Sequence, residues 1–203
     1  DNRYQNFLNI KKKYNQSCLT FKVSLRGNLE NCAYEIFRKE GPLALLPLDK
    51  NLYQVIWTSS TAVSLDRLNS DKNYLLDNLS MILPKNFKLD QMFGEPSVFP
   101  VSLSLNYPIL DLQKEVFVGD SFHTFHPVGG QGLNTCWRDV NSIFDILNEA
   151  DFMKKGNFKF LKFKYYFSRL KDICLTIIIT DTLIRIFANK NLILSPIKQL
   201  SFF

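Results

Sequence analysis

The residues best suited to chemistry lie in one stretch, 118–134, where an acid and a Gly-rich loop precede a helical pattern. Three of the chain's eight glycines, Gly129, Gly130 and Gly132, fall within four positions of this loop. Glycine lets a ligand approach the backbone closely, and a helix N-terminus offers free N–H donors with partial positive charge. The stretch therefore predicts a site for an anionic or electron-rich ligand. Asp120, at the end of a short strand, is placed to accept hydrogen bonds from sugar-like hydroxyls.

The loop differs from the two commonest phosphate-binding patterns. No Gly-Lys-Ser/Thr follows it, as in a Walker loop, and the dinucleotide fingerprint would carry an acid about twenty residues later. The two histidines of the sequence, His123 and His126, both fall in this stretch. Structural hydrogen bonding is the favoured role for each, with a catalytic base as the alternative, so no catalytic residue is assigned. With two histidines and four scattered cysteines, no metal site is predicted.

The composition is that of a globular protein: 203 residues, of which 46% are hydrophobic and 22% charged. The net charge of +6 comes from dispersed clusters of lysine. Solvated surface lysines are the favoured interpretation, an anionic membrane surface is the alternative, and no nucleic-acid partner is predicted. No apolar run reaches the ~20 residues that span a bilayer. The unpaired spacing of the cysteines predicts small buried groups in a reducing compartment, which indicates a cytoplasmic protein.

Alternating and continuously apolar runs predict strands at 18–25, 43–48, 52–58, 97–105 and 115–118. The run 43–48 is apolar at every position, which is typical of a strand covered on both faces. Pro47 must then lie at its end or where no ladder hydrogen bond is needed. Helical spacing predicts a short helix at 32–38, two short helices within 62–83, and two longer helices, one from 133 and one over 160–188. Because no repeat or linker interrupts this order, we expect one mixed α+β unit.

Both long helices carry an apolar stripe. The first stripe consists of Leu133, Trp137, Val140, Phe144 and Leu147, and we predict a core role for Trp137. The second stripe consists of Phe163, Phe167, Leu170, Cys174, Ile177 and Ile184. Asp181 lies on the line of the second stripe, four residues before Arg185, which predicts a helix ion pair. Anchoring of the helix to another domain is the alternative role for Asp181.

The stretch around Asp120 resembles a known motif. Asp120, His123, Pro127, Gly130, Gly132 and Asn134 stand at the spacing of the second FAD-binding motif of flavoprotein aromatic hydroxylases, which have the p-hydroxybenzoate hydroxylase fold. With Gly129, Gln131, Leu133, Arg138 and Asp139 added, the string resembles the ubiquinone-biosynthesis branch of that family. Further similarity at 14–16, 41–48, 57–58 and 180–181 extends the resemblance over about 14–187, nearly the whole chain.

The resemblance implies an α+β fold with a mixed or antiparallel substrate-domain sheet and helices, then the second FAD-binding motif and long C-terminal helices. The segments would be 1–110 for the substrate-domain sheet, 111–155 for the second FAD motif and its helix, and 156–203 for the C-terminal helix. Family members also carry a Gly-x-Gly-x-x-Gly turn for the ADP part of FAD and an Asp-Gly motif. Neither occurs in these 203 residues. We therefore expect the N-terminal Rossmann-type portion to be missing and the chain alone to be inactive.

The resemblance also assigns a cofactor site. Its residues would be Gly119, Asp120, Pro127, Gly129, Gly130, Gly132, Leu133 and Asn134. In the family, the acid matching Asp120 binds the ribityl chain, the loop lies against the isoalloxazine, and the following helix points its N-terminus at the pyrimidine edge. Leu45 and Pro47 would lie on a strand beside the substrate cavity, and a purely structural role in the core is the alternative. Phe122 and Trp137 depart from the smaller residues usual in the family, which puts ordinary FAD affinity in question.

The resemblance implies an FAD-dependent monooxygenase that uses NAD(P)H and dioxygen to hydroxylate a phenolic, polyprenylated ring in ubiquinone or related quinone biosynthesis. Its partners would be a hydrophobic small-molecule substrate and, in a peripheral association, a membrane or a quinone-biosynthesis complex. The alternative is a non-catalytic interaction module derived from the same fold. A reading frame that continues upstream into a Gly-x-Gly-x-x-Gly segment would favour the enzyme.

Overall fold

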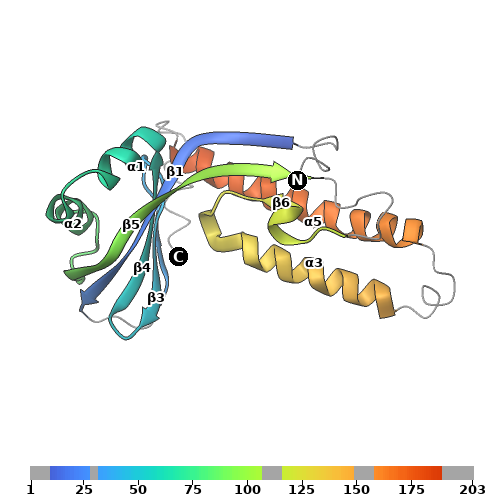
Figure 1. Cartoon of the computed structure of the whole chain (residues 1–203), viewed down its shortest axis with the longest axis horizontal. Coiled ribbons are helices and arrows are strands. Elements are labelled where there is room, and N and C mark those ends of the chain that lie inside the picture. The colour runs from blue at the N-terminus through green and yellow to red at the C-terminus, as the bar shows by residue number, and fades with distance from the viewer. Residues whose placement is uncertain (1–9, 28–31, 107–115, 149–157, 189–203) are drawn as a thin grey trace. The chain divides into compact units, whose positions relative to one another are not determined.

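The computed structural model describes residues 10–27, 32–106, 116–148 and 158–188, and the chain divides into two compact units (Figure 1). The first, here called the sheet unit, comprises Asn15–Val101 with the chain from Ile184 onward. The second, the helical unit, comprises Asp1–Tyr14 with Ser102–Leu183. This differs from the single unit expected from the sequence. Strands β1 (Ile10–Arg26) and β5 (Lys88–Leu105) run from one unit into the other, so no linker marks the boundary.

The strands of the described residues pair in the order β2-β3-β4-β1-β5-β6, and every pairing whose register is defined is antiparallel. The remaining strands are β2 (Tyr34–Ile36), β3 (Leu43–Asp49), β4 (Leu52–Ser60) and β6 (His123–Thr124). In the sheet unit, Trp57 of β4 lies opposite Leu19 of β1 and Leu43 of β3. In the helical unit, Ser104 of β5 lies opposite Thr124. The predicted α+β class with an antiparallel sheet is confirmed.

The core of the sheet unit forms where one sheet face meets two short helices, α1 (Thr61–Leu68) and α2 (Lys72–Ser80). Alternate residues of β1 from Leu19 to Leu25 point into this core, together with Leu75 and Leu79 of α2. The two helices begin at N-caps: the side chain of Ser60 accepts from the Val63 N–H, and Asp71 from the Asn73 N–H. The pair of helices predicted within 62–83 is confirmed.

Three strand and helix predictions need correction. Residues 34–36, predicted as part of a helix, form an edge strand, because a run of seven residues is too short to stabilise a helix and Tyr34–Ile36 pairs with β3 instead. Val116 forms an isolated bridge rather than a strand, and residue 115 lies outside the described residues. Strand β3 is covered on one face: Leu45 is buried, whereas Leu46 and Leu48 are exposed. Pro47 lies inside β3 rather than at its end, and the pairing with β4 shifts between Pro47 and Asp49.

In its described residues, the helical unit contains two long helices and two short 3₁₀ turns. The turns are η2 (Gly119–Ser121) and η3 (Val128–Gly130), and the helices are α3 (Gln131–Asn148) and α5 (Phe158–Ala188). A small core of Phe122, Ile146, Tyr165 and Ile173 joins these elements. Both helices lie close to their predicted bounds. Among the described residues, neither they nor any other helix is long and apolar enough to cross a membrane.

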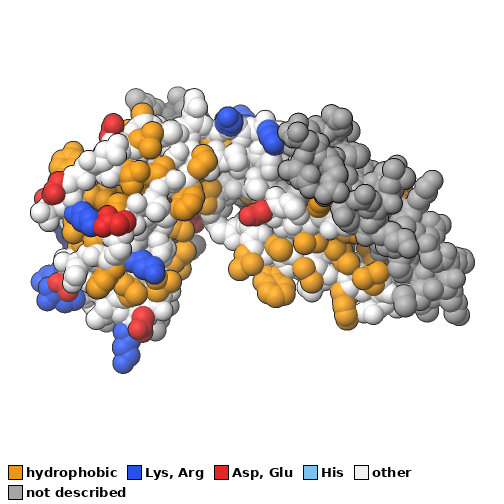
Figure 2. All heavy atoms as spheres, viewed as in Figure 1, with side chains coloured by type: hydrophobic (Ala, Val, Ile, Leu, Met, Phe, Trp, Pro, Cys, Tyr) orange, Lys and Arg blue, Asp and Glu red, His pale blue; other side chains and the backbone are white. Residues whose placement is uncertain are grey.

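Helix α3 exposes its apolar stripe and buries a polar face. The stripe residues Leu133, Trp137, Val140, Phe144 and Leu147 are each 41–68% exposed, and Figure 2 shows apolar side chains gathered along this helix. The buried positions of α3 are Thr135, Asp139 and Ile146. The predicted core role of Trp137 is therefore wrong within the described residues. Periodicity defines which side chains share a face of a helix, but it does not define what covers that face.

Helix α5 also differs from its predicted stripe, because apolar residues occur all around it. Phe163, Phe167 and Cys174 of the predicted stripe are exposed. The buried positions are Tyr165, Arg169, Ile173, Thr176 and Thr180. Cys32 is exposed as well, so the prediction of buried cysteines is wrong for two of the four. The predicted segments 1–110, 111–155 and 156–203 follow the order of the elements, and as a functional division they stay a prediction.

Candidate functional site

The turn that carries Asp120 requires a glycine at its first position. Gly119 is buried, has φ of +55°, and a Cβ there would lie 2.9 Å from the Sγ of Cys136. The Phe122 N–H donates to the Gly119 carbonyl at 2.8 Å, which closes the 3₁₀ turn. The Ser121 hydroxyl donates to the Val118 carbonyl at 2.7 Å. The left-handed backbone and the close Cys136 thiol thus both favour glycine at 119.

Asp120 itself is turned to the outside. Its side chain is exposed, and among the described residues its carboxylate takes part in no hydrogen bond or ion pair. The residues on each side of it are held by other groups, so Asp120 contributes no contact of its own to the turn. A free carboxylate at the end of a fixed turn suits an incoming ligand that donates hydrogen bonds.

The loop after the turn is anchored by His126. This side chain is buried, its Nδ1 accepts from the Val128 N–H at 3.2 Å, and its ring meets the Tyr14 ring edge-on at 5.3 Å between centroids. Burial lowers the pKa of His126 to about 4, although the charge of Asp181 partly opposes this shift. The imidazole is therefore neutral near pH 7, as its role of acceptor from a backbone N–H requires. The predicted structural role is consistent with this geometry.

The Gly-rich loop and the first turn of α3 leave open space beside the backbone. Gly129 and Gly130 have φ of +72° and +58°, and a Cβ on Gly130 or Gly132 would meet nothing within 4 Å. The further predicted site residues, Pro127, Leu133 and Asn134, are all exposed. The predicted cofactor residues thus lie on one continuous segment with an exposed edge, apart from buried Gly119. A flat ligand has room to approach this backbone.

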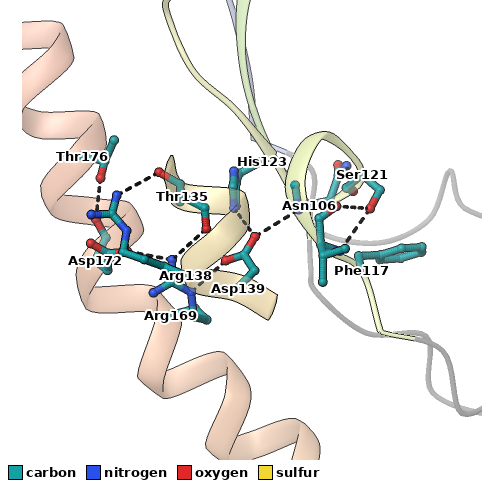
Figure 3. A network of polar contacts seen from close by, with 12 residues as sticks. Asn106, Phe117, Ser121, His123, Thr135, Arg138, Asp139, Arg169, Asp172 and Thr176 are labelled. Atoms are coloured by element: carbon teal, nitrogen blue, oxygen red, sulfur yellow. Dashed lines mark hydrogen bonds and ion pairs between the residues drawn. The ribbon is translucent and has the colours of Figure 1, made fainter. Parts of the chain in front are cut away.

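Behind the turn lies a buried charged network centred on Asp139 of α3 (Figure 3). Its carboxylate is fully buried and accepts from the Gly119 N–H at 3.0 Å and from the Nε–H of Arg169 at 2.7 Å. His123 Nε2 lies 2.7 Å from the same carboxylate. Burial by itself would raise the pKa of Asp139, but the bonds from His123, Arg169 and Gly119 outweigh it and hold this pKa below its ordinary value.

The network continues across α5 to a second acid. The Asp172 carboxylate lies 2.7 Å from the Nη2 of Arg169 and 3.0 Å from the Nε of Arg138. Two acids and two arginines alternate along this chain of contacts, so the charges of these four side chains balance one another. Sequence reasoning did not single out Arg169 or Tyr165, because they lie 30 and 48 residues from their partners Asp139 and Phe117, and no local pattern marks such pairs.

The bulky residue beside the acid points away from the open edge. Phe122 is 1% exposed and packs in the core of the helical unit, with its ring 6.0 Å from the ring of Tyr165 between centroids. Its departure from the family pattern is therefore accommodated inside the unit.

Asp181 of α5 pairs with Lys12 at 2.5 Å, and the Tyr14 hydroxyl donates to it at 3.4 Å. The predicted pair of Asp181 with Arg185 stays a prediction.

The two predicted substrate residues belong to the sheet unit. Leu45 is fully buried in its core and has no surface with which to touch a substrate in this conformation. Pro47 is half-buried, and its neighbours Leu46 and Leu48 are exposed on the face of β3 opposite to Leu45. Among the described residues there is no cluster of three or more metal-ligating side chains.

Comparison with solved structures shows the fold of the chain. The crystal structure of p-nitrophenol 4-monooxygenase PnpA from Pseudomonas putida superposes with a TM-score of 0.66 over 97% of this chain and 50% of its own, at 13% identity. This likeness shows that the chain shares its fold with about half of that monooxygenase. The exposed acid and the Gly-rich helix start lie on that fold. No family model matches the sequence.

Curated relatives define the branch. The 3-demethoxyubiquinol 3-hydroxylase of Escherichia coli is 30% identical over 142 residues, which is 68% of this chain and 35% of the relative. Ubiquinone hydroxylase UbiL of Rhodospirillum rubrum is 30% identical over 189 residues, 87% of this chain and 41% of its own length. The chain belongs to the ubiquinone-biosynthesis hydroxylase family of FAD-dependent aromatic-ring monooxygenases. It spans 35–41% of the length of these two relatives.

Proposed function

We propose that the protein containing this chain is an FAD-dependent monooxygenase. It would use NAD(P)H and dioxygen to hydroxylate a phenolic, polyprenylated ring in the biosynthesis of ubiquinone or a related quinone. The observation that carries the proposal is the free Asp120 carboxylate beside an open Gly-rich helix start, in a chain of this family. The two relatives described above are named as hydroxylases of 3-demethoxyubiquinol and of ubiquinone.

The residues present fit the isoalloxazine and ribityl half of FAD. Asp120 would accept hydrogen bonds from ribityl hydroxyls, and the open edge of Gly130 and Gly132 would lie against the ring. The free N–H groups at the start of α3 would stabilise negative charge at the pyrimidine edge. FAD, when bound, supplies the redox chemistry that activates dioxygen. The chain's own part is to bind the cofactor, orient it and present the substrate to it.

The sheet unit offers an apolar surface that supports a hydrophobic substrate. Leu46 and Leu48 expose their side chains on the open face of β3, with Pro47 between them. Such a surface favours contact with an aromatic ring or an isoprenoid tail. We place the substrate contact of β3 on this face. Leu45 and Pro47, the two candidates from the sequence, alternate with Leu46 and Leu48 and therefore share the other face.

The exposed stripe of α3 favours a second candidate, a non-catalytic interaction module. Large exposed apolar patches mark surfaces that bind another protein segment or a membrane. The same exposure is expected if the remaining part of a hydroxylase covers α3, because the chain spans less than half of its relatives. Binding of FAD by the full-length protein separates the two candidates.

Peripheral membrane association is a further proposal, made because the ring would carry an isoprenoid tail. It is checked by flotation of the full-length protein with liposomes.

The test compares wild-type full-length protein with Asp120→Ala. Loss of charge-assisted bonds worth roughly 1.5–3 kcal/mol should weaken FAD binding about ten- to a hundredfold. Asp66→Ala is the matched control, because Asp66 is an exposed acid on α1 of the sheet unit. Wild type and control should also restore ubiquinone synthesis to bacteria that lack 3-demethoxyubiquinol 3-hydroxylase. A flavin dissociation constant that Asp120→Ala leaves unchanged would remove Asp120 from the cofactor site.

A further inference from the structure

The backbone just before Asp120 is held by two buried side chains. Asp139 accepts the Gly119 N–H at 3.0 Å, and the hydroxyl of Tyr165 on α5 donates to the Phe117 carbonyl at 3.1 Å. Both side chains are almost fully buried, at 0% and 1% exposure. They reach the turn from α3 and α5, whereas the Asp120 side chain is exposed. The turn is therefore fixed by groups that no ligand bound at Asp120 would touch.

The contact from Asp139 is of the strong kind. A backbone N–H that donates to a buried carboxylate makes a charge-assisted bond in surroundings that screen it little. The carboxylate is itself oriented by Arg169 and by His123 Nε2, so it has little freedom to rotate away from Gly119. Gly119 in turn has a left-handed backbone that lies close to the Cys136 side chain, which restricts the conformations open to this residue.

The contact from Tyr165 depends on its hydroxyl alone. Burial raises the pKa of Tyr165, and the nearby Asp139 charge raises it further, so the hydroxyl keeps the proton that it donates. Its ring packs with Phe122 and Ile173 in the core of the helical unit. Replacement by Phe would keep this packing and remove only the bond to Phe117. This gives a mild variant in which the unit should still fold.

We propose that Asp139 and Tyr165 are positioning residues that hold the turn so that the Asp120 carboxylate is aimed at the cofactor before the cofactor binds. The inference rests on the proposed function. Preorganisation matters here because a ligand that must first order its own binding turn loses affinity to the entropy of ordering. Within the described part of the chain, no hydrogen bond or ion pair holds the Asp120 carboxylate, so its placement depends on the backbone that Asp139 and Tyr165 hold.

The first experiment uses the 203-residue chain without flavin and measures backbone amide NMR signals. In Asp139→Asn, the Gly119 amide proton should move upfield and its exchange with solvent should quicken about tenfold, because the charge-assisted bond is lost. In Tyr165→Phe, the signals of 117–120 should shift. Thr180→Val is the control: it removes another buried hydroxyl from α5, one that donates to the Thr176 carbonyl at 2.8 Å. The control should leave the turn signals in place.

The second experiment measures the FAD dissociation constant of the full-length protein. Tyr165→Phe should weaken binding about three- to tenfold, as the loss of one net hydrogen bond predicts, whereas Thr180→Val with a similar stability loss should bind as wild type does. Equal FAD affinity in Tyr165→Phe and wild type, or unshifted turn signals in both variants, would overturn the positioning role. A wild-type protein that binds no FAD would instead overturn the proposed function, and the cofactor-aiming role with it.

Discussion

Three glycine-to-alanine substitutions separate cofactor contact from backbone strain. Gly132 lies in the first turn of α3 without a positive φ, and a Cβ there meets nothing within 4 Å. In the chain alone, Gly132→Ala should therefore leave stability unchanged or raise it by up to about 1 kcal/mol, because alanine is the better helix former. If FAD lies against this backbone, the added methyl intrudes on it. Overpacking of about 1–3 kcal/mol corresponds to a loss of affinity of about 5- to 150-fold.

Gly130→Ala tests the same surface with a known backbone cost and a matched control. Gly130 and Gly94 of β5 have φ of +58° and +72°, and a Cβ at either meets nothing within 4 Å. Alanine in this left-handed region costs about 1–2 kcal/mol at each position. For a chain of this size, the melting temperature should fall by about 2–8 °C in both variants. Only Gly130→Ala should also weaken FAD binding, because Gly94 lies in the sheet unit outside the candidate site.

The assay measures two quantities on each variant: the melting temperature of the 203-residue chain, and the flavin dissociation constant of the full-length protein by fluorescence quenching. The cofactor interpretation requires that FAD affinity falls in Gly132→Ala while stability does not. If Gly132→Ala and Gly130→Ala both keep wild-type FAD affinity and normal turnover, these glycines only shape the turn. The assignment of the loop as a flavin site would then be refuted.

Three further predictions concern buried and exposed rings. Burial lowers the pKa of His126 to about 4 in the folded protein, below its ordinary value of about 6.5. Between these two pH values, unfolding is therefore accompanied by proton uptake at His126. The contribution of His126 to the free energy of unfolding is complete above pH of about 6.5 and is lost as the pH falls toward 4. Urea unfolding measures the free energy of unfolding at about pH 7 and at about pH 4.5. Between these two pH values, this free energy should fall by about 2–3 kcal/mol more in wild type than in His126→Asn. By the same method, Phe122→Ala should cost about 3–5 kcal/mol and Trp137→Ala under about 1, because only Phe122 is buried. The emission of Trp137 is obtained as the difference between the fluorescence spectra of wild type and Trp137→Phe. This emission should lie at shorter wavelength in the full-length protein than in this chain, because a covered indole emits at shorter wavelength. Equal emission wavelengths would mean that nothing covers Trp137 of α3.

Local patterns in the sequence determined the elements that carry the site. Alternation from Leu19 to Leu25 marks a half-buried strand, and the structure confirms it in β1. Helical spacing placed α3 and α5 close to their observed bounds. These inferences succeed because strand and helix periodicities depend on residues two to four positions apart. The glycines at 129, 130 and 132 likewise report on their own backbone, and two of them have positive φ.

Only the tertiary structure decided which faces are covered and which residues support the turn. The stripe through Trp137 has a regular helical period, yet it is exposed, because nothing in the helical unit packs on that side of α3 among the described residues. Asp139 and Tyr165 meet Gly119 and Phe117 across 20 and 48 positions. Such contacts arise from the packing of whole helices against a loop, which no short-range spacing of residue types encodes. The sequence by itself thus determined where the Gly-rich loop lies, and the fold decided which residues support the turn that carries Asp120.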